Sequence, residues 1–247
     1  MKDNFFCKKT FLNLYEQPSY NSKVASQIIY GEKFKILSKN KKWVKIKNVF
    51  DNYVGYVKHE NFSDNHKPTH KICNLKANIF RKSKSKTKNF LPFGAKISII
   101  NQNKKFVEFE KNKWIKKIDI KKLDYIEKNF IKIFKKFLNV KYVWGGKTFQ
   151  GIDCSALLQI FFYYNNLFYP RDTKDQIKYS IKRISKKFKR GDIIFWKGHV
   201  AICVNSKQLI HAYGPKKKVL IMPIKETIKR ILDTASLEVR KISKIKF

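Results

Sequence analysis

Hydrophobic and polar positions alternate along short segments of residues 11–62, a pattern typical of strands with one buried face. The segment Trp43–Ile46 is one such strand, and the turn-forming pair Asp51-Asn52 separates it from the next. Residues 71–124 repeat this plan, with a polar loop, a glycine and a tryptophan-containing strand in the same order. The pattern therefore predicts two small all-β barrels in succession.

The hydrophobic period changes near residue 124. Apolar residues then recur at the spacing of an amphipathic helix, at Ile126, Phe130, Ile133, Phe134 and Phe137. A later run, "CSALLQIFFYY" from Cys154, is apolar almost throughout and predicts a buried helix. With the polar stretch "SDNHKPTH" read as a linker, we predict three domains: residues 1–64, 65–124 and 125–247.

The charge of the chain first suggests a nucleic-acid partner. Its 56 Lys+Arg residues against 18 Asp+Glu residues give a formal net charge of +38, and basic surfaces bind phosphate backbones by releasing counterions. The lysines, however, occur in every segment from Lys2 to Lys246, and no zinc-finger spacing, RNP-like motif or compact basic helix accompanies them. We expect no specific nucleic-acid partner, and salt-sensitive binding to any polyanion is the alternative.

The start of the chain and its cysteines indicate a compartment. The first residues contain apolar pieces only two or three residues long, shorter than the roughly 7–15-residue core of a signal peptide. No stretch approaches the roughly 18 apolar residues that a membrane span needs. The cysteines Cys7, Cys73, Cys154 and Cys203 form no C-x-x-C pair. We expect a cytoplasmic protein without disulfides, metal or cofactor.

Cys154 is the candidate nucleophile. It follows the irregular, glycine-containing stretch Gly151-Ile152-Asp153 and begins the predicted buried helix. Unpaired N–H groups and the positive end of the dipole at a helix N-terminus stabilise a thiolate and lower the pKa of a cysteine. The sequence therefore predicts a reactive thiolate at residue 154.

His199 and His211 are the candidate partners of this thiol. They lie on two apolar segments that predict antiparallel strands joined near residues 205–207. If the hairpin loop has an odd number of residues, positions 199 and 211 face the same side of the sheet. One imidazole would then accept the thiol proton, and the other would orient it.

Six motifs in unbroken order carry a resemblance to a known family. They are Tyr142-x-Trp144-Gly145-Gly146, Gly151-Ile152-Asp153-Cys154-Ser155, "PRDTKDQ", "RGDIIFW", "GHVAICV" and "IHA". Residues 130–222 thus resemble the NlpC/P60 cysteine peptidases, although Ala156 stands where the family usually has glycine. The two N-terminal segments resemble bacterial SH3-like (SH3b) domains. The resemblance implies an α+β chain: a papain-like catalytic domain preceded by two SH3-like barrels.

The resemblance also implies roles for individual residues. Cys154 is the nucleophile, His199 the base, His211 the orienting residue and Tyr142 an oxyanion donor beside the Cys154 N–H group. Substrate-binding roles fall on Asp153, Ser155, Trp144, Asp172 and Thr173, and in the first SH3b domain on Glu32 and Tyr53, which would receive the substrate's ammonium group. Structural alternatives stay open: Asp153 as a helix cap, Tyr142 and Trp144 as core aromatics, and Arg171 with Asp172 as a local ion pair.

Two SH3b domains ahead of an NlpC/P60 domain, with no export signal, are similar to the γ-D-glutamyl-diamino acid endopeptidases that recycle cell-wall fragments. The resemblance implies a murein-derived peptide, L-Ala-γ-D-Glu-diamino acid with a free N-terminus, as substrate. An exported or wall-tethered endopeptidase and an SH3b-based wall-binding protein are the alternatives. The diamino acid and the oligomeric state are left open by the sequence.

Overall fold

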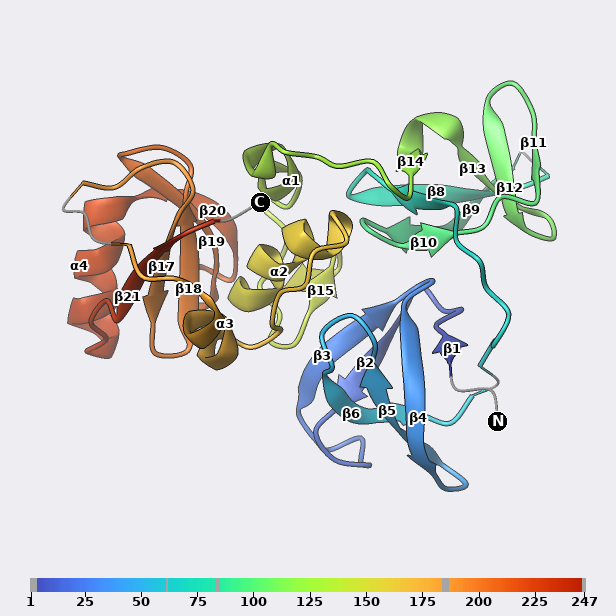
Figure 1. Ribbon diagram of the computed structural model, residues 1–247, viewed down its shortest axis with the longest axis horizontal. Helices are drawn as coiled ribbons and strands as arrows, with labels where there is room; N and C mark the ends of the chain where they lie inside the picture. Colours follow the sequence, from blue (N-terminus) through green and yellow to red (C-terminus); the bar gives the residue numbers. More distant parts are fainter. Residues whose placement is uncertain (1–3, 61, 83–84, 184–186, 246–247) are drawn as a thin grey trace. The chain divides into compact units, whose positions relative to one another are not determined.

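The structure of the protein is a computed structural model that describes residues 4–60, 62–82, 85–183 and 187–245. Its elements form two compact units (Figure 1). The first unit runs to Ile126 and includes the later segments Lys147–Phe149 and Tyr164–Asn166. The second unit contains the other residues from Glu127 onward. The separation after Ile126 lies close to residue 124, where the hydrophobic period changes.

The first part of the N-terminal unit is one six-stranded antiparallel sheet with the order β1-β4-β5-β6-β2-β3. Its strands are β1 (Phe5–Phe6), β2 (Phe11–Tyr15), β3 (Val24–Ile29), β4 (Lys33–Lys39), β5 (Trp43–Asn48) and β6 (Val54–Lys58). Alternate side chains fill a core around Leu14, Phe34, Val44 and Val57. Because β1 and β3 are the edges of this sheet, the predicted closed barrel is not confirmed.

The strands of the second part divide between two sheets, with the orders β10-β7-β14 and β11-β12-β13-β8-β9. They are β7 (His70–Ile72), β8 (Lys76–Arg81), β9 (Ser85–Pro92), β10 (Lys96–Ile97), β11 (Asn101–Gln102), β12 (Phe106–Glu110), β13 (Lys113–Lys116) and β14 (Ile120–Lys122), with the 3-10 helix η1 (Lys117–Asp119) before β14. The predicted β content is confirmed, whereas the predicted second barrel is not.

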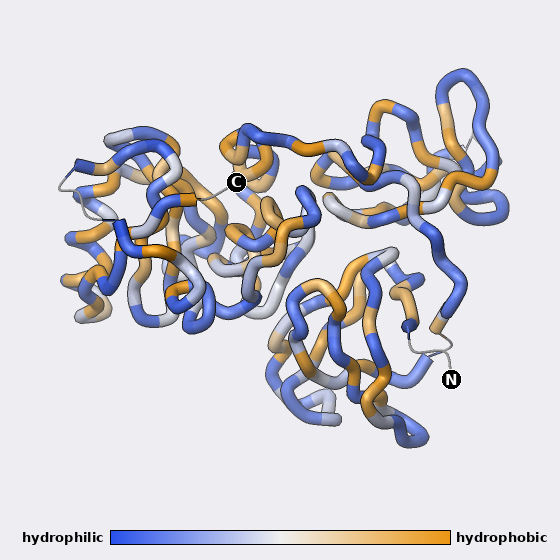
Figure 2. The backbone as a smooth tube through the Cα atoms, viewed as in Figure 1, coloured by the Kyte–Doolittle hydropathy of each residue, from blue (hydrophilic) through white to orange (hydrophobic). Residues whose placement is uncertain are grey.

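The second unit combines helices with a five-stranded antiparallel sheet of order β20-β19-β18-β17-β21. The sheet strands are β17 (Asp192–Trp196), β18 (His199–Cys203), β19 (Gln208–Tyr213), β20 (Lys218–Pro223) and β21 (Lys241–Lys244). Helix α4 (Ile224–Ala235) alternates hydrophobic and hydrophilic positions (Figure 2) and packs through Ile224 and Ile231 on one face of this sheet. The 3-10 helix η2 (Gly214–Lys216) lies between β19 and β20.

The remaining elements are α1 (Phe130–Lys136), β15 (Lys147–Thr148), β16 (Gly151–Ile152), α2 (Cys154–Tyr164) and α3 (Thr173–Tyr179). The prediction of a buried helix from Cys154 is confirmed, since every residue of α2 is buried. The predicted start of the preceding helix was wrong. Asn129 has a non-helical backbone with ψ of 88°, so α1 begins at Phe130 and Ile126 stays 45% exposed outside it.

Candidate active site

Asp153 fixes the N-terminus of α2, where Cys154 is the first residue. Its carboxylate accepts hydrogen bonds from the backbone N–H groups of Ala156 (2.8 Å) and Gly145 (3.0 Å) and from the Ser155 hydroxyl (3.0 Å). The bond to Ala156 satisfies a donor that the first turn leaves without an intrahelical partner. The helix-capping alternative for Asp153 is therefore confirmed, and its predicted substrate-binding role stays a prediction.

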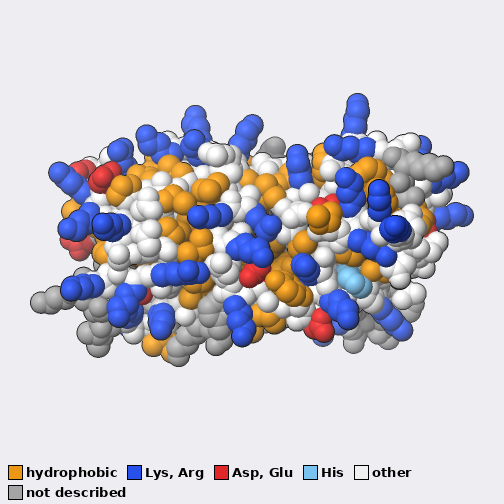
Figure 3. Space-filling view, turned by 90° about the horizontal axis from the view of Figure 1, so that it is seen from above, with side chains coloured by type: hydrophobic (Ala, Val, Ile, Leu, Met, Phe, Trp, Pro, Cys, Tyr) orange, Lys and Arg blue, Asp and Glu red, His pale blue; other side chains and the backbone are white. Residues whose placement is uncertain are grey.

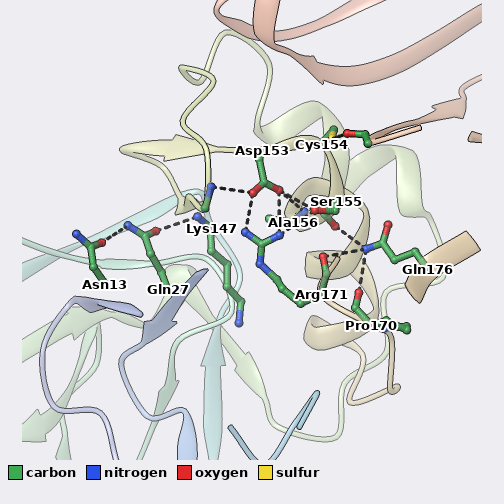
Figure 4. Close-up of polar contacts among 12 residues, drawn as sticks. Asn13, Gln27, Lys147, Asp153, Cys154, Ser155, Ala156, Pro170, Arg171 and Gln176 are labelled. Atoms are coloured by element: carbon green, nitrogen blue, oxygen red, sulfur yellow. Dashed lines mark hydrogen bonds and ion pairs between the residues drawn. The ribbon is translucent and has the colours of Figure 1, made fainter. Parts of the chain in front are cut away.

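A buried arginine completes this anchor. The guanidinium of Arg171 faces Asp153 (Figure 4) and donates to both of its carboxylate oxygens, at 3.1 and 2.7 Å, as well as to the Ser155 hydroxyl at 2.8 Å. This paired geometry is specific to the arginine fork. The structure thus pairs Arg171 with Asp153, and both Asp153 and Ser155 are bonded to protein groups.

The Cys154 thiol lies in a buried position against the strand that begins at His199. Its Sγ atom is 3.9 Å from the carbonyl oxygen of Gly198, to which it donates. Burial and the charge of Asp153 raise the pKa of Cys154 to about 12, although hydrogen bonds from the Val200 N–H group and the Thr173 hydroxyl oppose this shift. Removal from water thus opposes the effect of the helix N-terminus, and the reactive thiolate at Cys154 stays a prediction.

The two histidines lie on one face of the sheet, as the parity of their positions predicts. Strands β18 and β19 pair with Ile202 opposite Ile210, a register that also places Ala201 opposite His211. His199 shares the face of Ala201, two residues away. The Nε2 atom of His199 is 2.9 Å from the Nδ1 atom of His211, so the predicted contact between the two imidazoles is confirmed.

A contact with Met222 bears on the tautomers of this pair. The Nε2 atom of His211 lies 3.4 Å from the sulfur of Met222, which can only accept a hydrogen bond. We infer that His211 carries its proton on Nε2, so that its Nδ1 accepts from the Nε2–H group of His199. This assignment leaves the Nδ1 atom of His199 unprotonated, as a general base requires.

Burial opposes protonation of both imidazoles. Burial lowers the pKa of His199 to about 4. Burial and the neighbouring His199 lower the pKa of His211 well below its ordinary value. The ring of His211 also stacks on that of Tyr213, with centroids 4.7 Å apart. Together with the raised pKa of Cys154, these shifts indicate a neutral thiol and a neutral base near pH 7.

Tyr142 and Trp144 precede the nucleophile on an irregular segment. Burial, followed by the charges of Cys154 and Asp153, raises the pKa of Tyr142, so its hydroxyl keeps the proton that an oxyanion donor needs. Trp144 is 62% exposed, which contradicts the alternative that it is a core aromatic.

Asp172 is the N-cap residue of α3, and the buried Thr173 begins this helix.

The predicted residues of the first SH3b segment belong to the other unit. Glu32 is 2% exposed, and its carboxylate accepts from Lys147 Nζ (2.6 Å), Asn48 Nδ2 (2.9 Å) and the Ile29 N–H group (2.8 Å). This occupied, neutralised carboxylate argues against the predicted role of Glu32 in receiving an ammonium group. Tyr53 is half-buried and packs against the core of the first sheet.

Among the residues that the structure describes, no group of three or more His, Cys, Asp or Glu side chains is placed to bind a metal ion. Within the same ranges, no helix has the length and apolar character needed to cross a membrane. Lysine and arginine side chains are scattered over the face drawn in Figure 3 and do not gather into one patch there.

Comparison with known proteins identifies two regions of the chain. Residues 139–233 match the NlpC/P60 family, and residues 14–62 match the bacterial dipeptidyl-peptidase SH3 domain. The chain therefore carries both kinds of domain, as the motifs predicted.

Curated relatives share part of this sequence. The chain is 32% identical over 85 residues to the dipeptidyl-peptidase 6 of Lysinibacillus sphaericus, covering 34% of this chain and 31% of that protein. It is 33% identical over 100 residues to the gamma-D-glutamyl-L-lysine dipeptidyl-peptidase of Bacillus subtilis, covering 37% and 34%. The matches span about a third of the length of these relatives.

A solved structure covers nearly the whole chain. The crystal structure of an NlpC/P60 family protein from Bacillus cereus superposes with a TM-score of 0.81 over 98% of this chain and 99% of that one, at 17% identity. The similarity establishes the fold.

Proposed function

We propose, from the NlpC/P60 domain that the chain carries, that the protein is a cysteine peptidase acting on bacterial cell-wall peptides. One observation carries the proposal: the thiol of Cys154, at the start of α2, lies against the backbone beside His199, and His199 is bonded to His211. This arrangement supports the roles of Cys154 as nucleophile, His199 as base and His211 as orienting group in acyl transfer by a thiol.

The reaction begins with attack of the Cys154 sulfur on the carbonyl carbon of the scissile amide, while the Nδ1 atom of His199 accepts the thiol proton. The tetrahedral oxyanion receives hydrogen bonds from the Tyr142 hydroxyl and the Cys154 N–H group. His199 then gives its proton to the leaving amine as the C–N bond breaks. Water, deprotonated by His199, hydrolyses the thioester and returns the enzyme to its resting state.

The substrate we propose is L-Ala-γ-D-Glu-diamino acid, cut after the γ-linked glutamate to release L-Ala-D-Glu. Support comes from the SH3 domain of the dipeptidyl-peptidase type and from relatives named for dipeptidyl-peptidase activity. Release of a dipeptide requires a free N-terminus on the substrate. A role in recycling wall fragments would place the enzyme in the cytoplasm.

The test is incubation of the full-length protein with L-Ala-γ-D-Glu-diaminopimelate and with its N-acetylated form, followed by mass spectrometry of the products. We expect L-Ala-D-Glu from the free peptide only, and no product with Cys154→Ala. Equal cleavage of both peptides would favour the general endopeptidase alternative. Undiminished cleavage by Cys154→Ala would refute the thiol mechanism.

A further inference from the structure

A pocket of about 460 Å³ opens beside the catalytic base in the second unit. Tyr142 and His199 line it, and so do Arg230 and Ile231 of α4. Its size falls within the range of about 300–1,000 Å³ that is usual for small-molecule sites. The pocket is therefore large enough to receive part of a substrate that reaches the base.

The charges around this pocket are all positive. Lys197, Lys216 and Arg230 line it, and none of its lining residues is acidic. Among the residues that the structure describes, none of these three cations forms an ion pair with a carboxylate. All three are exposed, so each is available to an anion that enters the pocket.

A second basic pocket shows what distinguishes this one. The pocket of about 540 Å³ in the first unit is also lined by lysines, but its Lys8 and Lys113 pair with Glu110 at 3.8 and 2.6 Å. In a chain this basic, cations near a pocket are expected. The position beside His199 and the lack of a carboxylate partner are what give the pocket of the second unit a specific role.

The position of His199 indicates which part of the substrate enters. In the mechanism proposed above, this imidazole hands its proton to the leaving amine, so the residue that carries the amine starts next to His199. A pocket that His199 itself lines is therefore on the leaving-group side. The leaving residue of a murein peptide is the diamino acid.

We propose that the pocket of Lys197, Lys216 and Arg230 receives the side-chain carboxylate of a leaving diaminopimelate residue, and so selects diaminopimelate over lysine. This inference rests on the proposed peptidase function. A lysine side chain ends in an ammonium group alone, which three cations repel, whereas that of diaminopimelate also ends in a carboxylate, which they attract. Arg230 adds the planar fork that suits a carboxylate.

The experiment compares kcat/KM of the full-length protein for L-Ala-γ-D-Glu-diaminopimelate, its side-chain amide and L-Ala-γ-D-Glu-L-Lys. We expect a preference for diaminopimelate of about tenfold, since exposed charge pairs are individually weak. Amidation should remove most of this preference, and so should the double variant Lys216→Gln/Arg230→Gln. Lys229→Gln, which removes a charge from α4 outside the pocket, is the matched control and should leave the preference unchanged.

The possible outcomes separate a failure of the pocket assignment from a failure of the proposed peptidase function. Equal cleavage of the diaminopimelate and lysine peptides, or a preference for lysine, overturns the pocket assignment while the peptidase function stands. A preference for diaminopimelate that survives in the double variant also overturns the assignment, because the selectivity then lies elsewhere. Cleavage of neither peptide overturns both the pocket and the proposed function.

Discussion

The Nε2 atom of His199 lies 2.9 Å from the Nδ1 atom of His211. His211 therefore contacts the ring of the proposed base, and its replacement tests the orienting role. We expect His211→Leu to lower kcat by about 10²–10⁴-fold, because the imidazole of His199 loses both its orientation and its tautomer preference. His211→Asn, whose amide oxygen can accept the same bond, should retain more activity. Steady-state kinetics on both variants measure the difference.

Thermal unfolding of the two His211 variants supplies the control. A packing defect would lower the melting temperature and the activity of His211→Leu together, since the side chain is buried. Equal activity of the Leu and Asn variants at equal stability would contradict an orienting role.

Met222 offers a finer test of the same chain of contacts, because its sulfur accepts from His211 at 3.4 Å. Met222→Leu keeps the apolar volume and removes the acceptor, so we expect stability to change little. The loss of this weak bond should lower kcat by about two- to fivefold with little effect on KM. Nitrogen NMR of His211 should show the Nδ1–H tautomer gaining population. Unchanged ring signals would show that Met222 does not set the tautomer.

The reactivity of Cys154 should follow its raised pKa. Below the pKa of a thiol, the thiolate fraction grows about tenfold with each pH unit. Because burial raises the pKa of Cys154 to about 12, its alkylation by iodoacetamide should still accelerate between about pH 7 and 9. A Cys73→Ser background removes the partly exposed competing thiol, and Cys154→Ala gives the remaining baseline. A rate that levels off below pH 7 would instead show a preformed thiolate.

The acid limb of kcat/KM should report the base. The proposed base His199 must be a neutral imidazole, and burial lowers its pKa to about 4. Protonation therefore removes the base only as the pH falls toward 4, and we expect activity to persist through the region near 6.5 where an ordinary histidine titrates. Initial rates at low substrate concentration give this profile. A limb centred near 6.5 would mean that solvent reaches the ring freely.

Local patterns in the sequence predicted well where Cys154, His199 and His211 lie. The shared face of His199 and His211 follows from strand periodicity and the register across one hairpin, so it needs no distant information. The position of Cys154 at the start of α2 likewise follows from glycines before an apolar run. Closure of the N-terminal barrels was a different kind of prediction, because it depends on pairing between strands far apart in the chain.

The sequence could not predict which polar residues far apart in the chain form hydrogen bonds or ion pairs with each other. Arg171 reaches Asp153 across 18 positions, and Lys147 reaches Glu32 across 115. Lys147 is one of 56 Lys+Arg residues, and nothing in its neighbourhood marks it as buried. The sequence identifies the helix N-terminus at Cys154 but does not indicate how completely the fold removes the thiol from water.

The buried pair of Lys147 and Glu32 should contribute strongly to the stability of the first unit. Their side chains are 1% and 2% exposed, and the Nζ and Oε1 atoms lie 2.6 Å apart. Removing one charge leaves the other buried without its partner, so we expect Lys147→Met to lower the free energy of unfolding by about 3–5 kcal/mol.

Two further variants show whether this loss of stability comes from the Glu32 carboxylate, left buried without its cationic partner. Adding Glu32→Gln to Lys147→Met should restore a large part of the stability, because the uncompensated charge is gone. Lys132→Met is the matched control: its pair with Glu127 spans 2.9 Å, but Lys132 is 60% exposed, so the loss should stay below about 1 kcal/mol. Urea unfolding measures all three. If Lys147→Met and Lys132→Met cost the same, the buried pair is no more important to the fold than a surface contact.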